Sequence, residues 1–183
     1  NTGADCIVRR FADPNLLDAS SLPLEPTEAI VYPLERRGER FPFVAPQAEG
    51  FVLGELPEEP VYQYRAYLEG LAYLERLAYD TLGSLGAIVG RRIYSVGGAT
   101  KSRTGCQLRA DILQREIAVP EIASGAMGAA ILATRGCAYG LLSDATQHMV
   151  HISQHIAPRK QYQAEYDSSY QRFVSALKER GYV

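Results

Sequence analysis

Residues 92–113 read RIYSVGGATKSRTGCQLRADIL, and this stretch predicts a strand, a glycine turn and a helix in direct succession. The strand covers 92–96, which is rich in β-forming residues, and the helix runs over about 102–113. Because glycine has no Cβ atom, a ligand can approach the backbone closely at Gly97 and Gly98. The first N–H groups of a helix are unpaired and carry partial positive charge, so this junction suits a phosphate or the edge of a nucleotide.

Taken alone, the junction leaves two interpretations open. Residues 97–102 match neither the Walker A motif nor the GxGxxG fingerprint, and a strand followed by two glycines and a helix is also a common packing turn. Thr100 or Ser102 could cap the helix. Lys101 fits a solvated lysine at a helix start better than a phosphate contact. The local pattern therefore permits a nucleotide site without establishing one.

The rest of the chain alternates predicted helices and strands. The clearest signal is a helix at 61–82, where apolar and tyrosine residues recur every three or four positions. Arg65 with Glu69, and Arg76 with Asp80, are opposite charges four residues apart and are expected on the surface of this helix. The other predicted elements are one or two short helices within 4–20, strands at 29–34 and 117–119, a loop at 36–51, a helix at 125–135 with a surface of small residues, and a peripheral helix at 158–180. The alternation indicates an α/β layered domain.

The composition argues against several classes of partner. The chain has 183 residues with 19 basic and 21 acidic side chains, and its net charge of −2 argues against binding to nucleic acid or to an anionic membrane surface. No apolar run approaches the length of a transmembrane helix, so no membrane span is expected. The three cysteines show neither CxxC nor zinc-ligand spacing, which favours reduced thiols in a cytoplasmic protein.

Other residues that could carry chemistry are interpreted as structural. Cys106 and Cys137 are expected to be small buried hydrophobic residues rather than nucleophiles. Glu39 and Glu69 are interpreted as a structural pair that holds the 36–51 loop to the long helix, in preference to acid–base catalysts. Three tyrosines of that helix are assigned to packing rather than to sugar stacking, namely Tyr64, Tyr67 and Tyr73.

Three histidines, His148, His151 and His155, would share one face if their segment were helical, and a metal site needs such convergence. The segment is polar and has no HExxH pattern, so a surface cluster is the favoured interpretation. No catalytic residue and no metal ligand is assigned within this chain.

Several motifs together resemble the FGGY family of carbohydrate kinases. Residues 97–111, GGATKSRTGCQLRAD, resemble the family stretch GGGAKSxxWxQxxAD without a gap. Residues 119–136, VPEIASGAMGAAILATRG, are similar to its VP…(E/S)xGAxGAAxLAAxG segment. Upstream, 38–54 and 66–77 read GERFPFVAPQAEGFVLG and AYLEGLAYLERL, which resemble GERxPxxDPxARGxxxGL and LEGxA. In order and spacing the resemblance covers about residues 1–140.

The sequence departs from the family pattern at two positions of the first motif. Ala99 stands where many members have a third glycine, and Gly105 stands where the family usually has tryptophan. The chain opens on Asn1-Thr2-Gly3, which is similar to a family turn and is not an initiating methionine. We therefore expect the chain to be a fragment of a longer polypeptide.

The resemblance implies the ribonuclease-H-like fold of actin and hexokinase, of which this chain would form the C-terminal, ATP-binding domain. Residues 1–140 would be that domain, truncated at its N-terminus, and 141–183 a helical appendage of it. The nucleotide-binding residues carried over by position are Gly3, Gly97, Gly98, Ala99 and Ser102. Gly3 would lie on the wall opposite the glycine turn. The catalytic aspartate of the family belongs to the sugar-binding side, and its sequence context does not occur here.

The implied activity is transfer of the γ-phosphoryl group of ATP, with Mg²⁺, to a hydroxyl of a ketose or polyol. The closest similarity is to kinases of ribulose or xylulose. The fragment alone would be inactive, because the sugar binds through the missing N-terminal domain. The expected partners are ATP or ADP and a sugar, with no nucleic acid and no membrane, and a homodimer is left open. One alternative is a non-catalytic nucleotide-binding or assembly module with an actin-like half-fold. Another is a degenerate kinase remnant, which Gly105, in place of the usual tryptophan, slightly favours.

Overall fold

The computed structural model describes residues 4–11, 22–23 and 25–183. In chain order the elements are α1 (Ala4–Arg10), β1 (Ile30–Tyr32), β2 (Phe51–Leu53), α2 (Pro60–Ser84), β3 (Arg92–Tyr94), the 3₁₀ helix η2 (Gly98–Lys101), α3 (Arg103–Leu113), β4 (Glu116–Pro120), α4 (Gly125–Thr134), α5 (Leu142–Met149), β5 (Ile152–Ile156), the 3₁₀ helix η3 (Lys160–Tyr162) and α6 (Gln163–Glu179).

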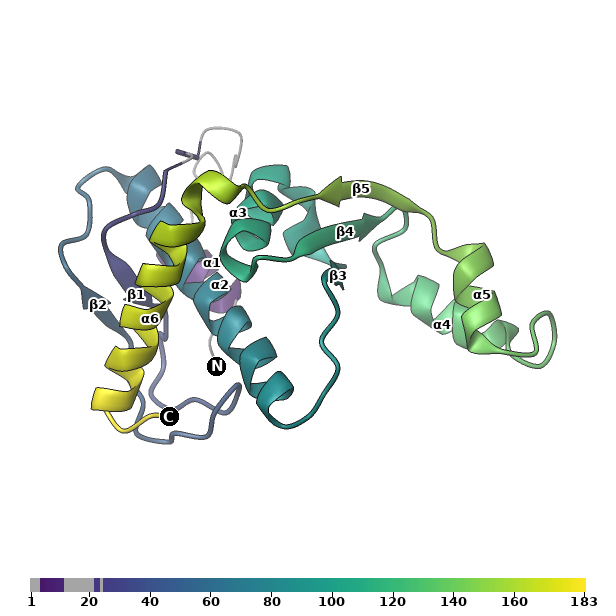
Figure 1. Cartoon of the computed structure of the whole chain (residues 1–183), viewed down its shortest axis with the longest axis horizontal. Coiled ribbons are helices and arrows are strands. Elements are labelled where there is room, and N and C mark those ends of the chain that lie inside the picture. The colour runs from purple at the N-terminus through teal and green to yellow at the C-terminus, as the bar shows by residue number, and fades with distance from the viewer. Residues whose placement is uncertain (1–3, 12–21, 24) are drawn as a thin grey trace.

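The long helix α2 runs through the centre of the molecule (Figure 1). The antiparallel pair β1–β2 and helix α6 lie on one side of α2, and α3 with the sheet β3–β4–β5 lies on the other. The helices α4 and α5 extend away from this body beyond the end of the sheet. The predicted helix at 61–82 and the strand at 29–34 are confirmed as α2 and β1.

The three-stranded sheet combines one parallel and one antiparallel pair. β3 pairs with β4 in parallel, which places Ile93 opposite Ile117, and β4 pairs with β5 in the antiparallel sense, which places Ile117 opposite Ile156. Apolar side chains of these strands pack against the buried face of α3, including Cys106 and Leu113. This packing fixes α3, and with it the turn that precedes α3, against the end of β3.

β1 crosses α2 at very close range, and Gly70 makes this possible. A Cβ atom added at Gly70 would overlap the carbonyl oxygen of Val31 and would lie 3.0 Å from Cδ of Pro33. The apolar side chains of β1 then enter cores on both of its faces, with Val31 packed towards α1 and Ile30 towards α6.

Helix α6 belongs to the main core, and the expectation of a peripheral helix is wrong. Its buried face packs against both α2 and β1 with Tyr166, Tyr170, Phe173 and Leu177. The ring of Phe173 lies 5.7 Å from that of Tyr73 on α2, centroid to centroid. The tyrosines that made this segment look polar in the sequence therefore use their rings for packing.

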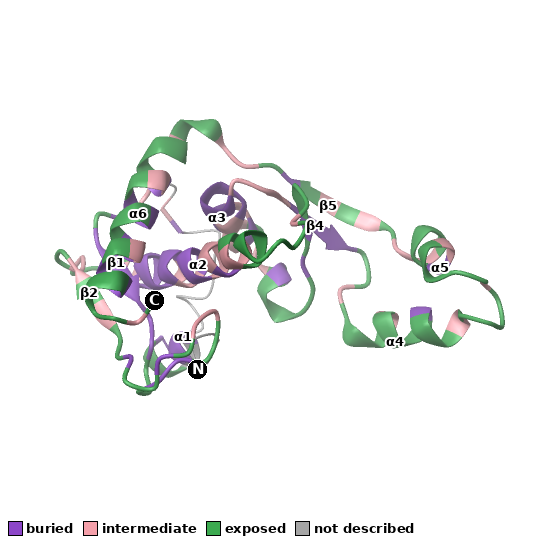
Figure 2. Ribbon diagram, turned by 60° about the horizontal axis from the view of Figure 1, so that its bottom comes forward, coloured by how far each residue is buried: buried purple, intermediate pink, exposed green. Residues whose placement is uncertain are grey.

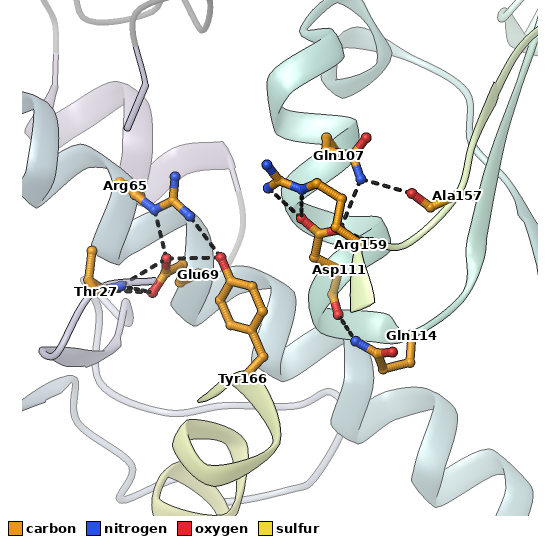
Figure 3. A network of polar contacts seen from close by, with 9 residues as sticks. All are labelled: Thr27, Arg65, Glu69, Gln107, Asp111, Gln114, Ala157, Arg159 and Tyr166. Carbon is orange, nitrogen blue, oxygen red and sulfur yellow. Dashed lines mark hydrogen bonds and ion pairs between the residues drawn. The ribbon is translucent and has the colours of Figure 1, made fainter. Parts of the chain in front are cut away.

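Arg65 and Glu69 form a buried ion pair rather than a surface pair, which corrects the sequence expectation (Figure 3). Nε of Arg65 donates to Glu69 at 2.8 Å, and its Nη2 donates to the hydroxyl of Tyr166 on α6 at 2.7 Å. Glu69 also accepts from the backbone and hydroxyl of Thr27. Burial raises the pKa of the Glu69 carboxyl, while Arg65 and Thr27 act to lower it. The pair is buried because α6 and the segment before β1 cover it.

A second buried carboxylate, Asp111 of α3, ties down the segment that leads into α6 (Figure 3). Arg159 donates to it from its backbone N–H and from Nε and Nη2, at 2.6 to 2.8 Å. Gln107 donates both to Asp111 and to the carbonyl oxygen of Ala157. The end of the motif at 97–111 therefore anchors the C-terminal part of the chain.

The helices α4 and α5 pack chiefly on each other, and most of their surface is exposed (Figure 2). α4 is apolar almost throughout, yet Ile131 is its buried residue and Leu132 is 64% exposed. Both helices leave the body through one narrow connection, where the N–H of Glu121 donates to the carbonyl oxygen of His151 at 2.9 Å.

Three elements are absent from the sequence prediction: β2, α5 and β5. The histidines consequently do not share a helical face, because His148 lies on α5 and His155 lies on β5. His148 stacks on Tyr139, and His155 contacts Glu116 at 2.6 Å.

Cys106 is buried as expected, whereas Cys137 is exposed in the loop between α4 and α5, which corrects that expectation.

None of the helices among the described residues combines the length and the apolar character needed to cross a bilayer. The same residues contain no group of three or more histidine, cysteine, aspartate or glutamate side chains arranged to hold a metal ion.

Candidate functional site

The glycine turn, residues 97–102, begins where β3 ends. The N–H of Ser95 still donates to Ala118 on β4 at 2.9 Å, so the strand pairing reaches almost to the turn. Gly97 then takes φ 87° and ψ −167°, a conformation that residues with a side chain rarely adopt. A turn of 3₁₀ helix, η2, begins at Gly98 and ends at Lys101, and α3 starts at Arg103.

Hydrogen bonds hold the glycine turn to the loop that follows β4 and to itself. The N–H of Gly97 donates to Ala123 at 3.1 Å, and the hydroxyl of Thr100 donates back to the carbonyl oxygen of Gly97 at 2.7 Å. Sγ of Cys106 lies 3.7 Å from the carbonyl oxygen of Ala99. Burial raises the pKa of the Cys106 thiol, so it is a neutral packing group. The N–H groups of Gly98 and Ala99 donate to no protein acceptor within the described part of the chain.

Ser102 is the N-cap of α3. Its Oγ accepts from the N–H of Gly105 at 2.9 Å, as expected of a serine at this position. The hydroxyl proton of Ser102 stays available to donate to a ligand. A Cβ atom at Gly105 would lie 3.0 Å from that Oγ, so a side chain at this position would crowd the cap. Gly105 thus leaves room beside the turn.

A pocket of about 840 Å³ lies between the glycine turn, α3 and one face of α2. Leu68, Leu71 and Ala72 of α2 and Leu108 of α3 form an apolar wall. Its polar groups are contributed chiefly by the turn and α3, with Gly98, Ala99, Lys101, Ser102 and Arg109 among them. The volume lies in the range typical of cofactor sites, and an apolar wall with a few directed polar groups is their usual composition.

A charged cluster of Glu75, Arg109 and Ser95 lines the same pocket. Arg109 donates from Nε and Nη2 to the two oxygens of Glu75, at 2.8 and 2.7 Å, and from Nη1 to Oγ of Ser95 at 2.7 Å. Burial acts to lower the pKa of Arg109, but the hydrogen bonds and charge of Glu75 outweigh it, so the pKa is raised. Arg109 is therefore a fixed cation paired with a carboxylate.

A second pocket, of about 770 Å³, lies on the other side of the β3 end. The sheet contributes Tyr94 and Ile152, and the helices α4 and α5 contribute Met127, Ile131 and Met149. Its lining is mainly apolar, with a few polar side chains such as Glu121 and Gln147, and carries none of the predicted nucleotide residues. Val96, just before the glycines, lines both pockets.

Comparison with protein-family models matches residues 7–137 to the FGGY family of carbohydrate kinases, C-terminal domain. The chain belongs to the FGGY family. This match includes the glycine turn, the long helix α2 and helix α4.

Known FGGY kinases share the fold along almost the whole chain. The xylulose kinase from Rhodospirillum rubrum superposes with a TM-score of 0.77 over 98% of this chain at 23% identity, and the gluconate kinase from Lactobacillus acidophilus with a TM-score of 0.82 over 98% at 23% identity. Among curated proteins, glycerol kinase 5 of Danio rerio is 26% identical over 152 residues, which is 82% of this chain. The chain spans 38% of each of the two solved structures and 29% of the zebrafish protein. The fold is thus the α/β, actin- and hexokinase-like fold of FGGY kinases, represented by its C-terminal domain.

The structure brings together three of the five residues carried over from the FGGY pattern. Gly98, Ala99 and Ser102 all line the pocket. Gly97 shapes the turn but does not line the pocket. Gly3 lies outside the described residues. Sequence reasoning did not single out Glu75 or Arg109 as site residues. Their ion pair joins two helices across 34 positions of sequence, and no local pattern signals it.

Those residues of the pocket that the structure describes do not offer a magnesium site of their own. Mg²⁺ in kinases is held by carboxylate, phosphate and water oxygens. Glu75 is the carboxylate that lines this pocket, and both of its oxygens accept from Arg109. The residues present therefore do not fit a protein-bound Mg²⁺ at this place.

Proposed function

We propose that this chain forms the ATP-binding wall of a longer FGGY kinase that phosphorylates a hydroxyl of a sugar or polyol. Residues 1–140 and 141–183 would be parts of one C-terminal domain. The observation that carries the proposal is that the N–H groups of Gly98 and Ala99, at the rim of a pocket with an apolar wall, have no acceptor among the residues that the structure describes.

Each part of this pocket matches a part of a nucleotide. The apolar wall from α2 suits the faces of a base, and the hydroxyl of Ser102 can donate to a base or ribose oxygen. The two backbone N–H groups, at the start of a short helix, suit the negative charge of a phosphate. Mg²⁺ would then arrive with the phosphates of ATP and find its protein ligands outside this pocket.

The substrate we propose is a ketose or polyol, and a pentulose such as ribulose or xylulose in particular. The support is the resemblance of residues 1–3, NTG, and 33–42, PLERRGERFP, to family members that act on ribulose or xylulose, together with the xylulose kinase among the structural neighbours. The catalytic base and the sugar site would lie in the rest of the parent protein, so these 183 residues alone would transfer no phosphoryl group. We propose a cytoplasmic location, where ATP and free sugars are available.

Gly98→Val tests the nucleotide site, because an added Cβ at Gly98 meets no atom within 4 Å and the variant should fold. The valine would cover the N–H groups at the rim, so we expect ATP affinity to fall about tenfold or more, as for the loss of one or two good hydrogen bonds. Calorimetric titration of the chain with ATP and with ADP measures this.

Gly140→Val is the matched control, since Gly140 lies in the loop between α4 and α5 and is equally uncrowded. It should bind ATP like the unaltered chain. Equal affinity of the Gly98→Val variant and this control would show that ATP does not bind at the turn. In the parent protein, ADP release with a panel of pentuloses, hexuloses and polyols tests the kinase activity, and no turnover with any of them would refute it.

A specific observation favours the alternative of a nucleotide-binding assembly module. The apolar helix α4 and the lining of the second pocket are exposed, as in proteins that dock against a partner. ATP binding by the parent protein without turnover of any sugar would support this alternative.

A further inference from the structure

We propose that Arg109 is a positioning residue that holds the glycine turn in its ligand-binding conformation through Ser95. The proposal rests on the proposed function for its effect on ATP, but its structural part can be tested without a ligand.

Arg109 is the point where three elements meet beside the pocket. Its guanidinium binds both oxygens of Glu75 on α2 and, from the opposite nitrogen, Oγ of Ser95 at the end of β3. The side chains of Arg109 and Glu75 are only 20% and 25% exposed, and Ser95 is buried. Glu75 therefore orients the guanidinium, and the guanidinium in turn holds Ser95.

Ser95 is well placed to transmit this constraint to the turn. Two residues separate it from Gly98, and its backbone N–H is already bound to Ala118 of β4. The strand thus fixes the backbone of Ser95, and Arg109 fixes its side chain. Gly97, held by Ala123, follows with its left-handed φ, so any rotation at Ser95 would move Gly98 and Ala99, which line the pocket.

The geometry of arginine explains why this residue type serves here. A planar guanidinium can bind a carboxylate with two parallel hydrogen bonds and still donate from its remaining nitrogen in a fixed direction. A lysine could pair with Glu75 as a point charge, but it has no rigid fork to hold Ser95 at the same time. Arg109→Lys should therefore keep the positive charge in the pocket but no longer hold Ser95, and through it the glycine turn.

The test compares Arg109→Lys, Ser95→Ala and the double variant in the 183-residue chain. ATP affinity by calorimetry should fall about tenfold or more in each single variant, since tenfold is the lower end of what one charge-assisted hydrogen bond contributes. Because both changes break one link, the double variant should match Arg109→Lys within about twofold. Amide hydrogen exchange of Gly97 and Thr100, the turn residues whose N–H groups are hydrogen-bonded, should speed up in all three variants when it is measured by NMR without ligand.

Arg92→Lys is the matched control. Arg92 lies three residues before Ser95 on the same strand and also binds a carboxylate through two nitrogens, on Glu116, but its pair is exposed and outside the pocket. This variant should change neither ATP affinity nor exchange at the turn.

The outcomes separate this inference from the proposed function. If the unaltered chain binds ATP and both single variants bind it equally well, or if the two losses multiply, the inference is overturned and the nucleotide site stands. If the unaltered chain binds no ATP, the proposed function fails for the isolated chain. The exchange rates then decide the inference alone: unchanged exchange in Arg109→Lys overturns it, and faster exchange confined to the turn supports it.

Discussion

Gly70 sets the distance between β1 and α2. Its backbone lies so close to the carbonyl oxygen of Val31 that no side chain fits between them, although it sits in the middle of a helix, where glycine is normally unfavourable. The lower helix propensity of Gly70 is offset because the close approach lets the side chains of β1 pack into two hydrophobic clusters.

Gly70→Ala is therefore expected to destabilise the fold, although alanine is the better helix former. Forcing the strand away from the helix should cost about 3 kcal/mol. Gly83→Ala on the same helix is the control, because a Cβ there meets no atom within 4 Å, and it should stabilise by about 0.5–1 kcal/mol. Urea denaturation of both variants measures the difference. Two changes of the same sign would contradict this account of Gly70.

The spacing of Arg65 and Glu69 is visible in the sequence and correctly predicts that they pair. Their burial is not visible, because it depends on Thr27 and Tyr166, which come from distant parts of the chain. The pairing of Arg109 with Glu75 depends likewise on how two helices cross.

Among the elements, α3 has two separate tasks. Its N-terminus is capped by Ser102 and directly follows the glycine turn. Its last turns carry Asp111, which binds Arg159 in the segment that leads into α6. The helix therefore connects the candidate site to the C-terminal part of the core.

Asp111→Asn should loosen this connection without altering the turn directly. It leaves Arg159 facing a neutral amide and removes acceptors for several donors, so we expect a loss of about 2–4 kcal/mol in unfolding free energy. Thermal denaturation followed by circular dichroism measures it. Glu116→Gln, which alters an exposed ion pair on β4, should leave the midpoint almost unchanged. A shift of equal size in the melting midpoint of both variants would argue against this role of Asp111.

Elements with strong local signals were predicted well, and those that depend on distant partners were not. The periodicity of α2 and the strand–glycine–helix junction of β3 and α3 are local, and the structure confirms both. β5 reads ISQHI, which has few β-forming residues, and it becomes a strand by pairing with β4. α5 has only eight residues, too few for a clear helical period.

At the scale of the whole molecule, burial is unevenly distributed. The body around α2 holds three clusters of buried apolar residues, whereas α4 and α5 hold few buried side chains between them (Figure 2). Local stability generally follows the density of buried contacts, so the two parts should not open together.

Hydrogen exchange should reveal this difference directly. Amides of α4 and α5 are expected to lose protection at denaturant concentrations at which α2 and α6 remain fully protected. Exchange measured by mass spectrometry across a guanidinium series reports on both segments in one sample. Simultaneous loss of protection in the two parts would show that they form one cooperative unit.

The narrow connection at Glu121 and His151 has a consequence for how this chain can vary. Because one backbone hydrogen bond already brings these two residues together, the intervening residues 122–150 form a loop that is closed at its base. The register of β4 and β5 is then set by their own pairing and not by what the loop contains. Lengthening, shortening or replacing residues 124–150 should therefore leave the sheet in place, and the glycine turn with it, because Ala123, which accepts from the N–H of Gly97, is retained. This segment is also the natural position for inserting a reporter domain or for opening the chain by circular permutation.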